Sequence, residues 1–195
     1  QPTADGQHYT ISGVMGPDEF HEEYPNSDHP GLTNNAYTNL MVAWLFTTIQ
    51  QLSDHTDATI LKTVSQKIHF GQQDYQTMTK IAQQLKLDIN ENGIIGQFEG
   101  YFNLPTLDFD AYRKKYGDIS RLDRILKSEG KTPDAYQVAK QADALMIYYN
   151  FNPTTVTTLL NQMGYPLPDQ ALTHNLEFYL ARTTHGSTLS RVVYA

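Results

Sequence analysis

A short acidic loop has the residue types of a proton donor. Its sequence, GVMGPDEFHE over residues 13–22, combines carboxylates with a phenylalanine ring and an imidazole, and its glycines and proline restrict the backbone. A carboxylic acid that donates a proton near neutral pH needs a raised pKa, which burial against apolar groups or a neighbouring carboxylate provides. Glu19 stands between Asp18 and Phe20, so both causes are available. Glu19 is therefore a candidate general acid, although composition alone favours a solvent-exposed acidic loop that caps the helix after it.

A second polar group, Lys140-Gln141-Ala142-Asp143, falls within a helix that the sequence predicts from Asp134 onward. Successive residues of a helix point about 100° apart, so Lys140 and Gln141 do not share one face. A lysine and a glutamine at the edge of a cleft suit sugar hydroxyls, which need several fixed donors and acceptors. The residues alone favour the simpler interpretation, a broad polar helix surface.

The third group is RTTHGSTLS over residues 182–190. Gly186 allows the backbone to approach an anion closely, and the surrounding hydroxyls and amides supply donors. If Ser187 begins a helix, its free N–H groups face the same anion. We predict an anion site here, with a Ser/Thr-rich helix cap as an equally supported alternative.

Composition disfavours several other chemistries. Cysteine is absent, so neither disulfides nor thiolate–metal bonds form. The seven histidines show no paired metal-ligand spacing, and we predict no metal site. No full Walker-type Gly-x-x-x-x-Gly-Lys-Ser/Thr loop occurs, so nucleotide binding is unsupported. With 14 basic and 21 acidic residues the net charge is −7, which disfavours a nucleic-acid partner.

The stretch over residues 30–53 carries no charge and has to be tested as a membrane span. Its continuous apolar part, Leu40–Phe46, is far shorter than the roughly 20 residues that a bilayer needs. We therefore predict no membrane segment and interpret the stretch as a helix that begins at Asn35 and is buried on all sides.

The elements that position these groups are predicted to be helices. Strict apolar–polar alternation is nowhere sustained, so strands should be few, and the fold class is all-α. A helical toroid and a plain bundle both fit this pattern. The first thirty residues and an aromatic stretch over residues 90–102 are predicted to be loops. The predicted helices cover residues 35–52, 58–68, 75–85, 118–127, 134–149, 153–164 and 169–181.

Four segments together resemble glycoside hydrolase family 65, the maltose, trehalose and kojibiose phosphorylases. They are GVMGPDEFHE with its continuation NNAYTN, then GQFEGYF, then LDFDAYRKKYGDISRLDRILKSEGKTPDAYQVAKQADAL, and finally LARTTHGSTLSR. They occur in the family's order and span almost the whole chain. The long third segment is most similar to the maltose phosphorylases of lactic acid bacteria.

The resemblance implies an (α/α)6 barrel of which this chain supplies roughly the C-terminal half. Residues 1–195 are then part of a single helical catalytic domain, and an N-terminal β-sandwich, the first half of the barrel and a C-terminal β domain lie outside them. It further implies a cytoplasmic enzyme that forms a homodimer as a full-length protein. No cofactor is implied, since inorganic phosphate is a co-substrate.

The resemblance also implies inverting phosphorolysis of an α-glucosidic disaccharide, with maltose and phosphate giving β-glucose 1-phosphate and glucose. Residue by residue, it makes Glu19 the general acid and Lys140 and Gln141 sugar contacts. The phosphate-binding residues that it implies are His185, Gly186, Ser187 and Thr188. The family's Trp-Asp motif has no counterpart, because the only tryptophan, Trp44, is not followed by Asp. We therefore expect an incomplete glucose subsite, exposed apolar surface and little activity for these residues alone.

Two alternatives remain. An inverting α-glucoside hydrolase of the same fold needs a second carboxylate as a base, roughly 6.5–9.5 Å from the acid. A non-catalytic sugar-binding helical module would keep the same loops as structure. The carboxylates available as a base are Asp18, Glu22, Glu99, Asp143 and Glu177.

Overall fold

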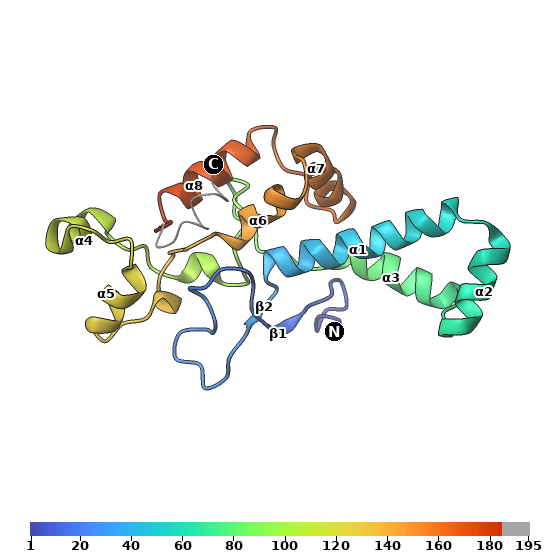
Figure 1. Cartoon of the computed structure of the whole chain (residues 1–195), viewed down its shortest axis with the longest axis horizontal. Coiled ribbons are helices and arrows are strands. Elements are labelled where there is room, and N and C mark those ends of the chain that lie inside the picture. Colours follow the sequence, from blue (N-terminus) through green and yellow to red (C-terminus); the bar gives the residue numbers. More distant parts are fainter. Residues whose placement is uncertain (185–195) are drawn as a thin grey trace.

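The computed structural model describes residues 1–184 and is mostly helical, as the sequence predicts (Figure 1). A short antiparallel pair, β1 (Ser12–Val14) and β2 (Leu32–Thr33), closes the base of the acidic loop. The α-helices of the described residues are α1 (Ala36–His55), α2 (Ala58–Ile68), α3 (Gln72–Gln84), α4 (Phe109–Tyr116), α5 (Leu122–Ser128), α6 (Asp143–Asn150), α7 (Pro153–Gln162) and α8 (Ala171–Leu180). Two single turns of 3-10 helix are η1 (Tyr101–Asn103) and η2 (Pro133–Ala135).

Helix α1 is the axis around which α3, α6 and α7 pack (Figure 1). It begins where the sequence predicts, because the Asn35 side chain accepts a hydrogen bond from the Thr38 N–H and so satisfies a free donor of the first turn. Its first half is buried through Ala36, Leu40 and Ala43.

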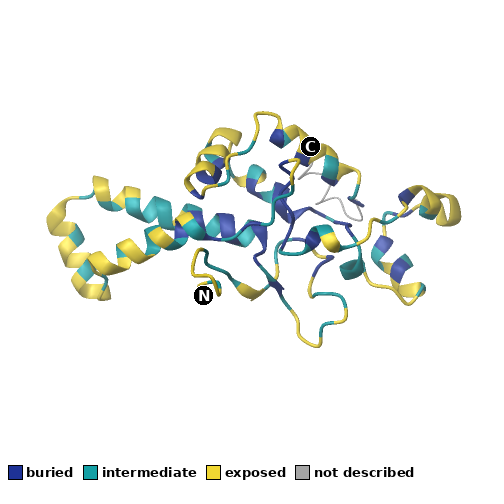
Figure 2. Cartoon of the chain, turned by 180° about the vertical axis from the view of Figure 1, so that it is seen from behind, coloured by how far each residue is buried: buried dark blue, intermediate teal, exposed yellow. Residues whose placement is uncertain are grey.

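The prediction that this helix is buried on all sides is wrong for its second half. Leu45 is 45% exposed and Leu52 is 62% exposed. Beyond the core, α1 continues into an arm that it shares with α2 and α3, and most of that arm is exposed (Figure 2). No helix in residues 1–184 combines the length and the apolar character that crossing a membrane requires.

The predicted helix over residues 134–149 is also wrong in its first half. Between η2 and α6 the chain is not helical but follows a series of bends, and α6 begins only at Asp143. The Ala139 N–H donates to the Arg182 carbonyl at 2.9 Å, and the Thr184 N–H donates to the Ala139 carbonyl at 2.9 Å. These long-range hydrogen bonds occupy the backbone groups that a helix would have used.

A smaller apolar cluster lies apart from the main core, where α4 and α5 pack with the acidic loop. Its buried members are Phe20, Phe109, Ile119, Leu122, Leu126 and Val138. Helix α4 was not predicted, although the Asp108 side chain caps it by accepting from the Ala111 N–H at 2.9 Å. Phe20 anchors the acidic loop in this cluster and so sets the position of Glu19.

Candidate active site

The acidic loop and the Lys140–Asp143 segment, far apart in sequence, are joined by hydrogen bonds. The Lys140 N–H donates to Asp18 Oδ1 at 3.1 Å, and the Gln141 side-chain amide donates to the Pro17 carbonyl at 2.7 Å. The Asp18 N–H donates to Asp143 Oδ1 at 2.6 Å. Two of the three groups that the sequence singled out are therefore one unit in space, and the non-helical backbone before α6 makes their contact possible.

A buried polar scaffold holds this unit from behind. The Asn35 amide donates to Asp143 Oδ2 at 2.5 Å, and the Asp143 N–H donates to Gln97 Oε1 at 2.7 Å. Asn35, Gln97 and Asp143 are each at most 1% exposed. Gly16 leaves room for this packing, since a Cβ there would lie 1.9 Å from Asp143 Oδ2. Gln97 was not among the residues that the sequence singled out. The signal that could have indicated it is the aromatic segment around it, which is flanked by Gly96 and Gly100.

His21 completes the scaffold on the side of the aromatic loop. Its Nε2 lies 3.0 Å from the Tyr136 carbonyl, and its Nδ1 lies 3.6 Å from Asp18 Oδ2. Its ring packs against Phe98, with ring centroids 5.1 Å apart. A charged imidazole in this position would offset the negative charge of the two buried carboxylates, Asp18 and Asp143.

Burial and mutual repulsion shift the pKa values of the scaffold. Burial, together with the charge of Asp18, raises the pKa of Asp143 to about 7. Burial lowers the pKa of His21, but its hydrogen bond with Asp18, the Asp18 charge and the Tyr136 carbonyl outweigh burial, so this pKa lies above its ordinary value. Asp143 and His21 therefore have raised pKa values, whereas Glu19 does not.

Glu19 is in a different environment from the one that the sequence suggested. Its side chain is 57% exposed, and Lys140 Nζ donates to its Oε2 at 2.5 Å. This hydrogen bond holds the pKa of Glu19 below its ordinary value, so the expected increase by burial or by a neighbouring carboxylate is wrong for this structure. The reason is the direction of the loop: Asp18 and Phe20 face inward, 4% and 5% exposed, and Glu19 between them faces out.

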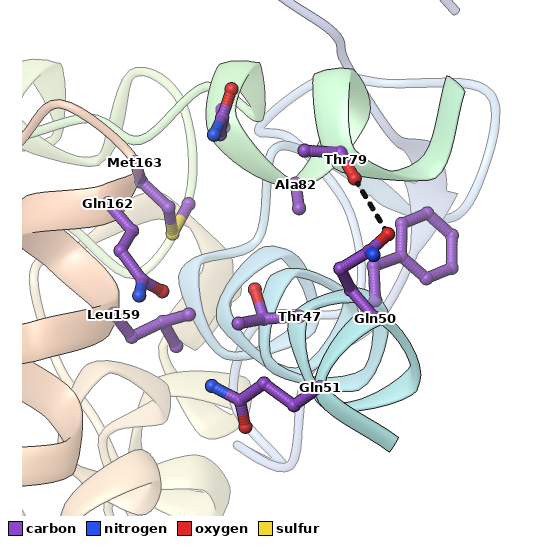
Figure 3. A pocket seen from close by; sticks show the side chains of 10 residues that line it. Thr47, Gln50, Gln51, Thr79, Ala82, Leu159, Gln162 and Met163 are labelled. Carbon is purple, nitrogen blue, oxygen red and sulfur yellow. Dashed lines mark hydrogen bonds between the residues drawn. The ribbon is translucent and has the colours of Figure 1, made fainter. Parts of the chain in front are cut away.

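Glu19 and Lys140 lie at the edge of a cavity of about 670 Å³ between the acidic loop, α5 and η2. Its volume is within the range of sugar-sized sites. A second cavity of about 250 Å³, lined from α1, α3 and α7, holds glutamines, threonines and apolar groups but no titratable side chain (Figure 3). Of the two, only the Glu19 cavity can move a proton.

The other carboxylates considered as a base have different positions. Asp18 and Asp143 are buried in the scaffold. Glu99 pairs with Lys86 and accepts from the Asn34 amide at 2.7 Å, and its pKa lies below its ordinary value because these hydrogen bonds and the Lys86 charge outweigh burial. Glu177 is an exposed residue of α8, and Glu22 is exposed and lines the Glu19 cavity.

The predicted phosphate-binding residues, His185, Gly186, Ser187 and Thr188, lie outside the described residues. The segment just before them is described: Thr183 pairs with Ala139 as a parallel bridge. This pairing brings the chain beside the residue that precedes Lys140. Within residues 1–184, no group of three or more His, Asp or Glu side chains is close enough to hold a metal ion.

Comparisons with known proteins agree with the motif analysis. Residues 2–195 match the profile of the glycosyl hydrolase family 65 central catalytic domain. A trehalose 6-phosphate phosphorylase of Lactococcus lactis is 48% identical over 98% of this chain and 23% of its own length. A kojibiose phosphorylase of Halothermothrix orenii is 29% identical over 96% of this chain and 21% of its own length. A solved structure from the human microbiome, described as a kojibiose phosphorylase, superposes with a TM-score of 0.69 at 23% identity, covering 100% of this chain and 22% of that one.

Proposed function

Because the chain belongs to glycosyl hydrolase family 65, we propose that it carries the acid side of an inverting phosphorylase active site that cleaves an α-glucosidic disaccharide with inorganic phosphate. The observation that carries the proposal is the position of Glu19 at the edge of the 670 Å³ cavity. Of the two cavities described above, this one has titratable groups and the other has none. The two residues just before Glu19, Pro17 and Asp18, are held by hydrogen bonds to the Lys140–Asp143 segment.

In the proposed reaction Glu19 protonates the glycosidic oxygen while a phosphate oxygen attacks the anomeric carbon from the opposite face. The new bond joins phosphate to the anomeric carbon, the glycosidic C–O bond breaks, and the proton leaves with the second sugar. Phosphate is already an anionic nucleophile near neutral pH, so it needs positioning more than a base. We assign that positioning to His185, Gly186, Ser187 and Thr188.

Lys140 has two parts in this proposal. In the absence of substrate it holds the pKa of Glu19 low, which keeps the carboxyl ionised. If Lys140 turns to a sugar hydroxyl when the substrate binds, the carboxylate loses that hydrogen bond and its pKa rises, as proton donation requires. Gln141, at 9% exposure, supports the acidic loop through Pro17, so its contact with sugar is the less direct of the two.

The chain spans about a quarter of the length of the Lactococcus relative, so the active enzyme is proposed to be a longer protein. In that protein residues 1–195 are part of the helical barrel, flanked by an N-terminal β-sandwich, the first half of the barrel and a C-terminal β domain. A cytoplasmic homodimer remains part of the proposal.

Two substrates have separate support. Trehalose 6-phosphate is favoured by the relative that is 48% identical to this chain. Maltose is favoured by the resemblance of the long segment that contains α4 and α5. Both are α-glucosides, so the choice between them changes the second sugar and leaves the role of Glu19 unchanged.

The test is to incubate the longer protein with maltose, trehalose or trehalose 6-phosphate, with and without phosphate, and to follow the products by proton NMR. β-Glucose 1-phosphate that appears only with phosphate supports the proposal and identifies the substrate. Glucose release that does not depend on phosphate would make the protein a hydrolase, whose base would act from the face of the sugar opposite Glu19. No turnover of any α-glucoside would favour a non-catalytic sugar-binding module.

A further inference from the structure

The Glu19 cavity is lined by several cationic side chains. They are Arg121, Arg124, Lys127, Lys131 and Lys140. The carboxylates that line it are Glu19, Glu22, Asp123 and Asp134. The lining thus has one more cation than carboxylates, although the whole chain has a net charge of −7.

Most of these charges already have partners. Lys140 pairs with Glu19, Arg121 pairs with Asp123 at 2.8 Å, and Lys131 pairs with Glu129 at 2.8 Å. The Asp134 carboxylate accepts hydrogen bonds from the Glu22 and Glu23 N–H groups and from the Thr132 hydroxyl.

Two cations remain, Arg124 and Lys127, and neither has an ion pair among residues 1–184. They are three residues apart on α5, so their side chains lie on the same face of that helix. The opposite face is buried through Leu122 and Leu126, which fixes the direction in which Arg124 and Lys127 point. Both line the cavity that Glu19 lines.

The proposed reaction determines which part of the substrate reaches these cations. Glu19 protonates the oxygen that departs with the second sugar, and inorganic phosphate attacks from the other face of the first sugar. The cavity on the Glu19 side therefore receives the leaving sugar. An arginine beside a lysine recognises a phosphate monoester well, since the guanidinium forms paired charge-assisted hydrogen bonds and the ammonium adds a compact charge.

On these grounds, and resting on the proposed function, we propose that Arg124 and Lys127 bind a phosphoryl group on the leaving sugar. The substrate class is then a phosphorylated disaccharide, and the product bound at this wall is a hexose phosphate. Free inorganic phosphate shares this chemistry, so the experiment has to separate the two sources.

The test measures binding of glucose 6-phosphate and of glucose to the longer protein by isothermal titration calorimetry. The variants are Arg124→Gln, Lys127→Gln and the double variant. Lys114→Gln is the control, because Lys114 is an exposed lysine of α4 that does not line this cavity. The wild type and the control should bind glucose 6-phosphate about 10- to 100-fold more tightly than glucose, and the double variant should lose this preference. The substituted side chains are exposed, so the melting temperature should stay unchanged.

Kinetics separate the remaining outcomes. The double variant should lose kcat/KM for trehalose 6-phosphate by a similar factor, while kcat/KM for trehalose and KM for inorganic phosphate should stay within about twofold. A wild type that binds both sugars equally, or a double variant whose KM for inorganic phosphate alone rises, would overturn the inference. If selective binding is lost in the variant but no α-glucoside is turned over, the proposed function fails, and only the binding of a sugar phosphate by Arg124 and Lys127 stands.

Discussion

At the scale of single residues, the acidic loop has a buried carboxylate, Asp18, directly before an exposed one, Glu19, and the two have separate tasks. Asp18 is 4% exposed and accepts hydrogen bonds from the N–H groups of Phe20 and Lys140, so it shapes the backbone around Glu19. Glu19 itself is exposed and bound only through its carboxylate end. Chemistry and support are thus assigned to neighbouring residues, and substitutions should separate them.

Replacing Glu19 with glutamine should reduce kcat of the longer protein by about 10²- to 10⁴-fold, the usual loss of a general acid. The amide keeps the shape and can still contact Lys140, so the thermal unfolding temperature should hardly change. Steady-state phosphorolysis and a thermal melt check both parts. The control is Glu22→Gln, an exposed carboxylate on the same cavity, which should retain most of the activity. Comparable activity in wild type and Glu19→Gln would remove Glu19 as the acid.

Asp143 should make the stability of the chain depend on pH. Its pKa is about 7 in the folded chain and has an ordinary value of 3.8, so the folded state binds this proton more tightly. That stabilisation is complete below about pH 4 and is lost as the pH rises through 7. His21, which faces the same pair of carboxylates, has the same sign because its pKa is also raised.

The measurement is urea unfolding of wild type and Asp143→Asn between pH 5 and pH 8. The variant loses an acceptor for Asn35 at every pH, which is a constant offset, but residue 143 can no longer titrate. The free energy of unfolding of the wild type should therefore fall relative to the variant as the pH rises. Parallel pH profiles would show that Asp143 has an ordinary pKa.

At the scale of elements, the site depends on a loop packed against an irregular segment, with helices only at its borders. Gly16 is the closest point of that packing, since a Cβ would meet both Asp143 Oδ2 at 1.9 Å and Asn35 Nδ2 at 2.5 Å. All the atoms concerned belong to the scaffold behind Glu19. Any side chain at this position must therefore displace the loop or the scaffold.

Gly16→Ala should lower the free energy of unfolding by about 1–3 kcal/mol, as overpacking of a tight interior does. It should also lower kcat of the longer protein, because the displaced loop carries Glu19. Met15→Ala is the matched control: Met15 is the neighbouring residue, is 58% exposed, and should change stability by less than about 0.5 kcal/mol. Urea unfolding and phosphorolysis of both variants give the comparison. If Gly16→Ala matches the wild type in both stability and activity, the loop is not held by this contact.

The sequence predicted elements well where the signals were local. Asn35 caps α1, and Asn152 with Pro153 starts α7, because capping depends only on residues within one turn. It failed for residues 136–142, where apolar residues occur at helical spacing but hydrogen bonds to Pro17, Asp18, Pro105 and Arg182 keep the chain from forming a helix. Such partners lie far away in the chain, so no local pattern reports them.

The same limit applies to the site. The residue types of Glu19, Lys140 and Gln141 were visible in the sequence, but which side of the loop faces inward has no periodic signature. Placing Glu19 outward and Asp18 inward required Phe20 to be anchored against α5 and Asp18 to face His21. The pKa of Glu19 was therefore predicted in the wrong direction.

At the scale of the whole molecule, the arm of α1, α2 and α3 extends away from the main core with a large exposed surface (Figure 2). Helix α2 has no buried residue, and Ile60, Val64 and Ile68 form an apolar stripe along it, 57%, 47% and 60% exposed. An exposed stripe of this kind is an association site when nothing covers it. The chain spans about a quarter of its Lactococcus relative, so we expect other parts of the longer protein to cover it.

This expectation predicts that one triple variant affects the 195-residue chain and the longer protein in different ways. Ile60→Gln/Val64→Gln/Ile68→Gln should reduce self-association of the 195-residue chain in light scattering, with little change in melting temperature, because these side chains are exposed there. In the longer protein the same triple variant should lower the melting temperature, because it removes apolar contacts that would be buried. A control with Thr63→Gln and Lys67→Gln, on polar positions of the same helix, should change neither property. If the triple variant of the longer protein has the same melting temperature as the wild type, the stripe is exposed there too and the arm has some other partner.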